Sequence, residues 1–183
     1  MRWTFGESIE GLDVDGRPLR AAVFDEHAVR AAAGLTMALG AVAFAYAYFA
    51  KVYAPIQAVT VMFFAEFALR LAGGLRLSPL GWLARMLVRR YDPQWVSAKP
   101  KRFAWTLGLL MALAMAVITN VGIRGALPLT ICLLCLTLMW LEAVLGLCLG
   151  CEIHRLLVRG GWATKDEAFE HCAGGACALE RHP

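Results

Sequence analysis

Hydrophobic positions in this chain come in long uninterrupted blocks, and charged positions gather between them. Four blocks contain no charged residue: 31–50, 52–65, 104–123 and 127–141. With their flanks these blocks approach the roughly twenty residues that a helix needs to cross a bilayer. We therefore expect transmembrane helices at about 28–50, 54–75, 104–121 and 127–151. The predicted fold class is all-α, a membrane four-helix bundle.

Polar segments frame the four expected helices. Residues 1–24 are predicted to be a polar N-terminal segment, in which Asp15-Gly16 favours a turn between two short strands. Asp25 is placed to cap the first helix. The residues from Ser78 to Arg89 have the pattern of a short amphipathic helix on the inner leaflet.

The C-terminal part is predicted to form two pieces. The fourth helix is expected to continue past the membrane until Gly160-Gly161 stops it. The helical membrane domain would then cover residues 25–159, and residues 160–183 would be a tail that contains cysteines.

Composition supports a membrane protein. The chain has 183 residues, 60% of them hydrophobic and only 17% charged, whereas soluble domains carry more charge. The net charge of +4 comes from basic residues at the edges of the apolar blocks, so it does not indicate nucleic-acid binding. Acidic residues precede the first apolar block, which is unlike a cleavable signal peptide.

Basic residues set the expected topology. The loop from Arg76 to Arg102 contains one acid, Asp92, and these basic residues: Arg76, Arg85, Arg89, Arg90, Lys99, Lys101 and Arg102. The positive-inside rule places this loop in the cytoplasm, and with four spans both termini are cytoplasmic too. The expected location is the bacterial inner (cytoplasmic) membrane, as a multi-pass protein.

Two CxxC motifs lie on the predicted fourth helix. Cys132 and Cys135 are near its outer end, and Cys148 and Cys151 are near its inner end. Paired cysteines suit thiol–disulfide chemistry, although cysteines also serve as small residues for helix packing. Along a continuous helix the two pairs would be about 24 Å apart and rotated by about 160°. They would need a carrier, a quinone or a moving helix to exchange electrons.

The inner cysteines also allow a metal interpretation. Cys148, Cys151, Cys172 and Cys177 have a spacing close to that of structural zinc sites, and His154 is nearby. An iron–sulfur cluster is a further alternative. The sequence leaves bound metal, thiol relay and no chemistry open.

Two carboxylates interrupt apolar helices. Glu66 and Glu142 are expected at similar depth, where an ionisable group is costly and indicates a function or a buried partner. Arg70 lies four residues after Glu66 and could pair with either acid. Glu66 and Glu142 are therefore candidates for proton transfer, or for a structural Glu–Arg–Glu clamp between the second and fourth helices.

Three segments carry a family resemblance: Asp25–Gly34, Lys99–Trp105, and the block from Cys132 through Glu142 to Cys151. Together they resemble the bacterial membrane family called domain of unknown function 4395, over roughly residues 12–155. The doubled cysteine block is the most specific part. The resemblance implies a small helical membrane protein without an established reaction, and suggests thioredoxin-like or sulfurtransferase partners. Four spans with an outer CxxC are also similar in outline to disulfide-generating quinone reductases.

These observations favour a membrane thiol–disulfide oxidoreductase or sulfur-handling protein. In this hypothesis Cys132 and Cys135 exchange with a partner, Glu142 and Glu66 manage protons, and the inner pair connects to cytoplasmic thiols. One alternative is a non-catalytic subunit of a larger membrane complex, whose cysteines bind metal or pack. The other is a small transporter of a sulfur species. The candidate cofactors are a quinone, zinc or an iron–sulfur cluster.

Overall fold

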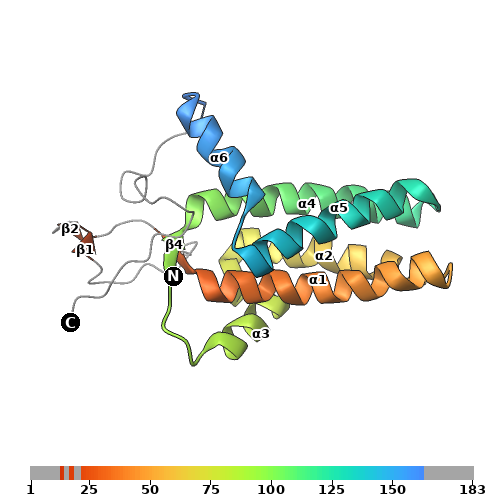
Figure 1. The fold of residues 1–183 in the computed structure, drawn as a ribbon, viewed down its shortest axis with the longest axis horizontal. Helices are drawn as coiled ribbons and strands as arrows, with labels where there is room; N and C mark the ends of the chain where they lie inside the picture. Colours follow the sequence, from red (N-terminus) through yellow and green to blue (C-terminus); the bar gives the residue numbers. More distant parts are fainter. Residues whose placement is uncertain (1–12, 15–16, 19–21, 163–183) are drawn as a thin grey trace.

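Apolar composition and length produce four long helices, which the computed structural model arranges as a bundle (Figure 1). The structure describes residues 13–14, 17–18 and 22–162. The bundle helices are α1 (Glu26–Phe49), α2 (Ala54–Gly73), α4 (Ala98–Asn120) and α5 (Ala126–Leu145). Each is long and apolar enough to cross a membrane, which confirms the predicted all-α membrane bundle.

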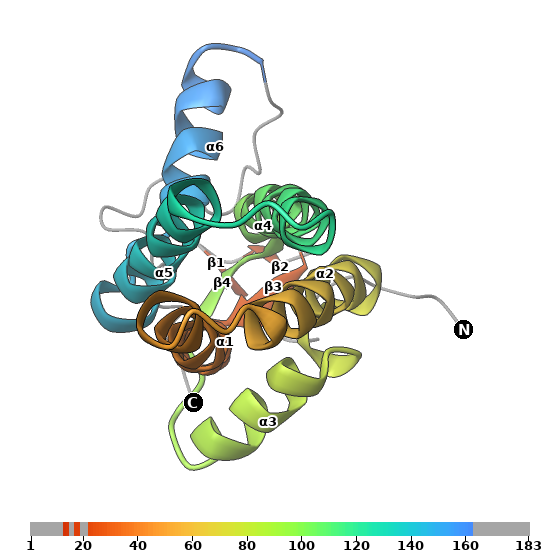
Figure 2. The ribbon, with the colours of Figure 1, turned by 90° about the vertical axis from the view of Figure 1, so that its right-hand side faces the viewer.

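The four helices surround a common interior. Viewed along the bundle, they follow one another around a ring in the order α1, α2, α4 and α5 (Figure 2). The most extensive packing joins α2 to α4 and α1 to α5. Small residues of α1 such as Ala32, Ala43 and Ala47 are fully buried, which allows close helix approach, whereas Leu113 and Leu133 face outward. The outward side chains form an apolar surface suited to lipid.

A two-stranded sheet ties together the starts of α1 and α4. Strand β3 (Val23–Asp25) pairs antiparallel with β4 (Trp95–Ser97). As predicted, Asp25 caps α1, because its side chain accepts a hydrogen bond from the His27 backbone N–H at 3.1 Å. A second, separate pair of strands, β1 (Asp13–Val14) and β2 (Arg17–Pro18), flanks the predicted Asp-Gly turn.

The predicted amphipathic helix is present as α3 (Pro79–Val88), after the 3-10 turn η1 (Gly74–Arg76). Ser78 caps α3 by accepting a hydrogen bond from the backbone N–H of Gly81 at 2.8 Å. Helix α3 packs against α1 at the end of the bundle where α1 and α4 begin (Figure 1).

The expectation of one continuous fourth helix is wrong. Helix α5 ends at Leu145, Gly146 takes a left-handed conformation (φ 68°, ψ 13°), and α6 (Leu149–Arg159) begins after Cys148. Figure 1 shows α6 leaving the bundle at an angle to α5. Glycine adopts this conformation without steric cost, so the chain can turn here.

A long-range contact stabilises this turn. The Arg30 guanidinium, from α1, donates hydrogen bonds to the carbonyl oxygens of Ala143 (3.2 Å) and Val144 (2.7 Å). These carbonyls belong to the last turn of α5 and would otherwise lack partners within the helix. The inner CxxC motif therefore lies at the start of α6 and not on the fourth transmembrane helix.

Candidate functional site

A buried lysine lies between two carboxylates at the end of the bundle where α6 begins. Lys101 Nζ is 3.2 Å from Glu26 Oε1 and 3.2 Å from Glu142 Oε1. The three residues come from α4, α1 and α5, and each is less than 10% exposed. Two carboxylates facing one ammonium leave the cluster with one acid more than its base can neutralise, so it is suited to holding a proton.

Arg70 belongs to a different cluster. Its guanidinium contacts Glu66 Oε1 at 2.9 Å and the Thr36 hydroxyl at 3.2 Å. Glu66 also accepts hydrogen bonds from the Ser78 hydroxyl and, at 3.4 Å, from the Leu80 backbone N–H. The proposed Glu–Arg–Glu clamp between the second and fourth helices is therefore replaced by two pairs: Arg70 with Glu66, and Lys101 with Glu142.

The cluster around Glu66 has a clear structural use. Through Thr36 it reaches α1, and through Ser78 and Leu80 it holds the first turn of α3. Glu66 accepts four hydrogen bonds, two of them from Arg70. Because these hydrogen bonds hold the carboxylate in one position against α3, Glu66 is better suited to anchoring α3 than to transferring a proton.

The inner cysteines occupy the first turn of α6. Cys148 is the N-cap residue, in an extended conformation (φ −88°, ψ 100°), and its Sγ accepts a hydrogen bond from the Cys151 backbone N–H at 3.3 Å. A helix N-terminus favours negative charge, so a thiolate at Cys148 would meet both this N–H and the positive end of α6. Lys101 is close enough for its charge to act on both sulfurs.

The two sulfurs are not equivalent. Two causes raise the pKa of the Cys151 thiol: the side-chain hydrogen bond with Cys148, which is the larger, and burial. The charge of Lys101 opposes the rise. Cys151 therefore keeps its proton at neutral pH and shares it with the neighbouring sulfur. Cys148 is 8% exposed and faces the interior of the bundle.

Gly150 allows this close assembly. A Cβ atom at this position would lie 2.7 Å from both Cα and Cβ of Ala104 on α4. Only glycine therefore lets the first turn of α6 approach α4, where Lys101 is located. Gly150, one of the two residues between the cysteines, thus controls how close the pair lies to the buried cation.

A cavity of about 200 Å³ in the bundle is lined by residues of both CxxC motifs. Cys132 and Cys135 line its outer part, and Cys148 lines its inner end, together with Glu142 and Arg70. The two pairs had been expected to face different neighbours, on the basis of a continuous helix. The turn at Gly146 changes the direction of the chain, so that both motifs contribute to one cavity.

The outer pair has a less favourable geometry for a disulfide. All four described cysteines are free thiols, and Cys132 and Cys135 both lie within regular helix α5. At this spacing their Cβ atoms are about 5–6 Å apart, whereas a disulfide needs about 3.8 Å. Cys148, in contrast, lies outside the regular helix at the cap position, where its side chain can turn toward Cys151.

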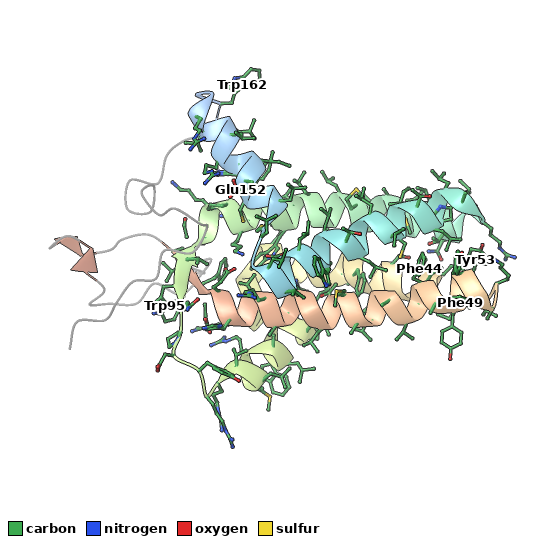
Figure 3. The ribbon with its side chains drawn as sticks, viewed as in Figure 1. Phe44, Phe49, Tyr53, Trp95, Glu152 and Trp162 are labelled. Atoms are coloured by element: carbon green, nitrogen blue, oxygen red, sulfur yellow. The ribbon has the colours of Figure 1, made fainter. Side chains whose placement is uncertain are left out.

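Figure 3 shows how the two ends of the bundle differ. Glu152, next to Cys151 in the first turn of α6, and Trp95 of β4 lie toward the end with the cysteine–lysine site. Phe44, Phe49 and Tyr53 lie at the opposite end, where aromatic side chains are typical of a membrane boundary.

The metal interpretation rests largely on residues outside those described. Cys172 and Cys177 lie there, and so does most of the predicted tail. Within the described part of the chain, no group of three or more potential metal ligands comes together. His154 packs near the Phe103 ring, with 5.6 Å between ring centroids.

Sequence reasoning missed Lys101 and Glu26 as members of the site. Lys101 was counted among the basic residues of a cytoplasmic loop, but α4 begins at Ala98 and carries it into the bundle. One signal was available: a buried acid such as Glu142 requires a cation, and Lys101 was a candidate as well as Arg70. The contact of Arg30 with the end of α5 was not predicted either.

Comparisons with known proteins give one match. The family model described as "Domain of unknown function (DUF4395)" matches residues 24–159. No curated protein and no solved structure matches the chain.

Proposed function

This chain belongs to the DUF4395 family, and we propose that it is a membrane thiol–disulfide redox protein whose reactive pair is Cys148 and Cys151. The observation that carries the proposal is the position of this CxxC motif. It caps a helix, lies within electrostatic range of the buried Lys101, and contributes Cys148 to an apolar cavity that Glu142 also lines. Thiolate stabilisation, a proton acceptor and an apolar binding space are the three elements that such chemistry needs.

The proposed reaction has two balanced steps. In the first, the thiolate of a partner dithiol attacks the Cys151 sulfur of a Cys148–Cys151 disulfide, and Cys148 leaves as a thiolate. The second partner thiol then displaces Cys151, so the partner leaves as a disulfide and the pair becomes a dithiol. In the second step, the pair gives two electrons and two protons to a lipid-soluble acceptor of the quinone class, and its disulfide re-forms.

The different environments of the two sulfurs support these roles. Cys151 is partly exposed and does not line the cavity, and we propose that it is the sulfur that a protein partner attacks. Cys148 lines the cavity and is the sulfur that receives the Cys151 N–H. Lys101 and Glu142 provide the route by which the protons leave the pair. Thioredoxin-like and sulfurtransferase proteins are the partner classes that we propose.

The positive-inside rule supports a cytoplasmic location for this end of the bundle. Arg76, Arg85 and Arg102 lie in or beside the connection that joins α2 to α4, at the same end as α6. We therefore propose a bacterial inner-membrane protein in which the reactive pair faces the cytoplasm.

The test uses purified full-length protein in liposomes that contain a short-chain benzoquinone, with dithiothreitol as the thiol donor. Reduction of the quinone is followed by its absorbance. We expect Cys148→Ser and Cys151→Ser to lower the rate to that of protein-free liposomes, and Cys132→Ala to retain most of it. A wild-type rate no higher than that of the liposomes alone, or full activity in Cys148→Ser, would contradict the proposal.

A second candidate function is transport of a small sulfur species. It is favoured by the cavity, because three of the four described cysteines line it from the outer part of the bundle to the inner end. Uptake of radiolabelled thiosulfate into vesicles tests it, with wild-type protein compared with Cys132→Ala. Equal uptake with and without the protein would rule out this function for thiosulfate.

A further inference from the structure

A second cavity lies outside the bundle, between α3 and the start of α1. Its volume is about 280 Å³, and strands β3 and β4 contribute to its wall. Three arginines line it: Arg76 from η1, Arg85 from the C-terminal part of α3, and Arg89 directly after α3. The lining contains one acid, Asp25. The formal charge of the lining is therefore positive, at the end of the bundle where the basic loop lies.

The position of α3 gives this cavity a defined surrounding. The helix is anchored to the bundle by the Ser78 and Leu80 contacts with buried Glu66. On its outer side Trp82, Met86 and Leu87 are 59%, 54% and 58% exposed. An anchored helix with an exposed apolar face and basic residues has the character of a helix that lies in the membrane interface. Its apolar side chains then contact acyl chains.

We propose that this cavity binds the headgroup of an anionic phospholipid. The phosphate lies among Arg76, Arg85 and Arg89, whose guanidinium groups can donate paired hydrogen bonds to phosphate oxygens. The acyl chains continue along the exposed side chains of α3. A lipid fits these observations better than a free anion, because the basic cavity adjoins an apolar surface on the same helix. This proposal is independent of the thiol chemistry.

The cytoplasmic leaflet supplies the ligand in quantity. Anionic lipids there attract basic residues near the surface by about 1 kcal/mol each, which corresponds to a factor of about five in affinity. If the cavity is a specific binding site, each arginine that lines it should contribute more affinity than this general attraction, and other basic residues should not. Arg90 provides a matched control, because it follows Arg89 directly and is exposed, but does not line the cavity.

The experiment is native mass spectrometry of the full-length protein in detergent, titrated with phosphatidylglycerol or with phosphatidylcholine. We expect the wild type to bind phosphatidylglycerol more tightly than phosphatidylcholine. Arg85→Gln and Arg89→Gln should each weaken phosphatidylglycerol binding by more than about fivefold, and Arg90→Gln by about fivefold or less. Thermal unfolding of each variant is measured in parallel, and Arg89→Gln, at the exposed end of α3, leaves the anchoring contacts intact.

Three results would overturn the proposal. The first is equal binding of phosphatidylglycerol and phosphatidylcholine by the wild type, a result that does not depend on the folding of any variant. The second is an equal loss of binding in Arg89→Gln and Arg90→Gln, which would indicate general surface charge. The third is complete displacement of phosphatidylglycerol by millimolar inorganic phosphate, which would identify a site for a free anion.

Discussion

Replacing Gly150 by alanine should separate the reactive cysteines from the buried lysine. The added Cβ would lie 2.7 Å from Cα and Cβ of Ala104, whereas carbon atoms pack at about 3.5–4.0 Å. The deficit is about 1 Å. Because the obstructing atoms are backbone or attached directly to it, no side-chain rotation relieves the contact, and α6 has to move away from α4.

The size of the effect follows from this displacement. Overpacking of this kind costs about 1–3 kcal/mol, and each kcal/mol lowers the unfolding midpoint of a chain of this length by roughly 2–4 °C. Lys101 precedes Ala104 by three residues and shares its side of α4. A shift of α6 therefore also moves Cys148 away from Lys101 and uncovers a sulfur that is 8% exposed in the native protein.

Two measurements on protein in nanodiscs test this prediction. We expect Gly150→Ala to lower the unfolding midpoint and to increase the rate at which Cys148 is alkylated by a maleimide, read by peptide mass spectrometry. Leu156→Ala on the exposed side of α6 serves as the control and should change neither. If Gly150→Ala had the wild-type midpoint and alkylation rate, the close approach of α6 to α4 would be refuted.

Three further substitutions test individual contacts. Lys101→Met leaves two facing carboxylates buried and should lower the free energy of unfolding by about 3–5 kcal/mol. Adding Glu142→Gln should recover part of this loss, and no recovery would argue against the Lys101–Glu142 pair. Arg30→Met removes the donor that satisfies the last carbonyls of α5 and should lower the free energy of unfolding by about 1.5–3 kcal/mol. Amide hydrogen exchange should become faster only at the turn around Gly146, and unchanged exchange there would contradict this role of Arg30. Glu66→Gln should weaken the anchoring of α3, which would appear as faster amide hydrogen exchange in its first turn. Slower quinone reduction with unchanged exchange in α3 would instead indicate that Glu66 transfers protons.

The sequence was sufficient for the features that depend on local composition. Long apolar blocks predicted the four spans, and the spacing of apolar and basic residues predicted α3 to within a residue at each end. Asp25 was recognised as a cap because its residue type and its position before an apolar block are enough. Strands β3 and β4 were missed, since three residues are too few to show an alternating pattern.

The missed features depend on contacts between distant parts of the chain. Leucines continue on both sides of Gly146, so the apolar pattern gives no sign of a turn, and glycine is tolerated within helices. The turn depends on Arg30, more than one hundred residues earlier. Similarly, the sequence cannot say that Lys101, rather than Arg70, pairs with Glu142, because both cations stand near a helix end. The sequence therefore predicted the cysteines and Glu142 as members of the candidate site, but it did not predict how these residues are arranged.

The most direct test of the proposed site is the reduction potential of each cysteine pair in the wild-type protein. Membranes are equilibrated with glutathione buffers of increasing oxidation, free thiols are alkylated, and each pair is read by mass spectrometry. We predict a reversible two-electron transition to a disulfide at Cys148 and Cys151, while Cys132 and Cys135 remain thiols throughout. A transition confined to Cys132 and Cys135, with the inner pair reduced in every buffer, would contradict it.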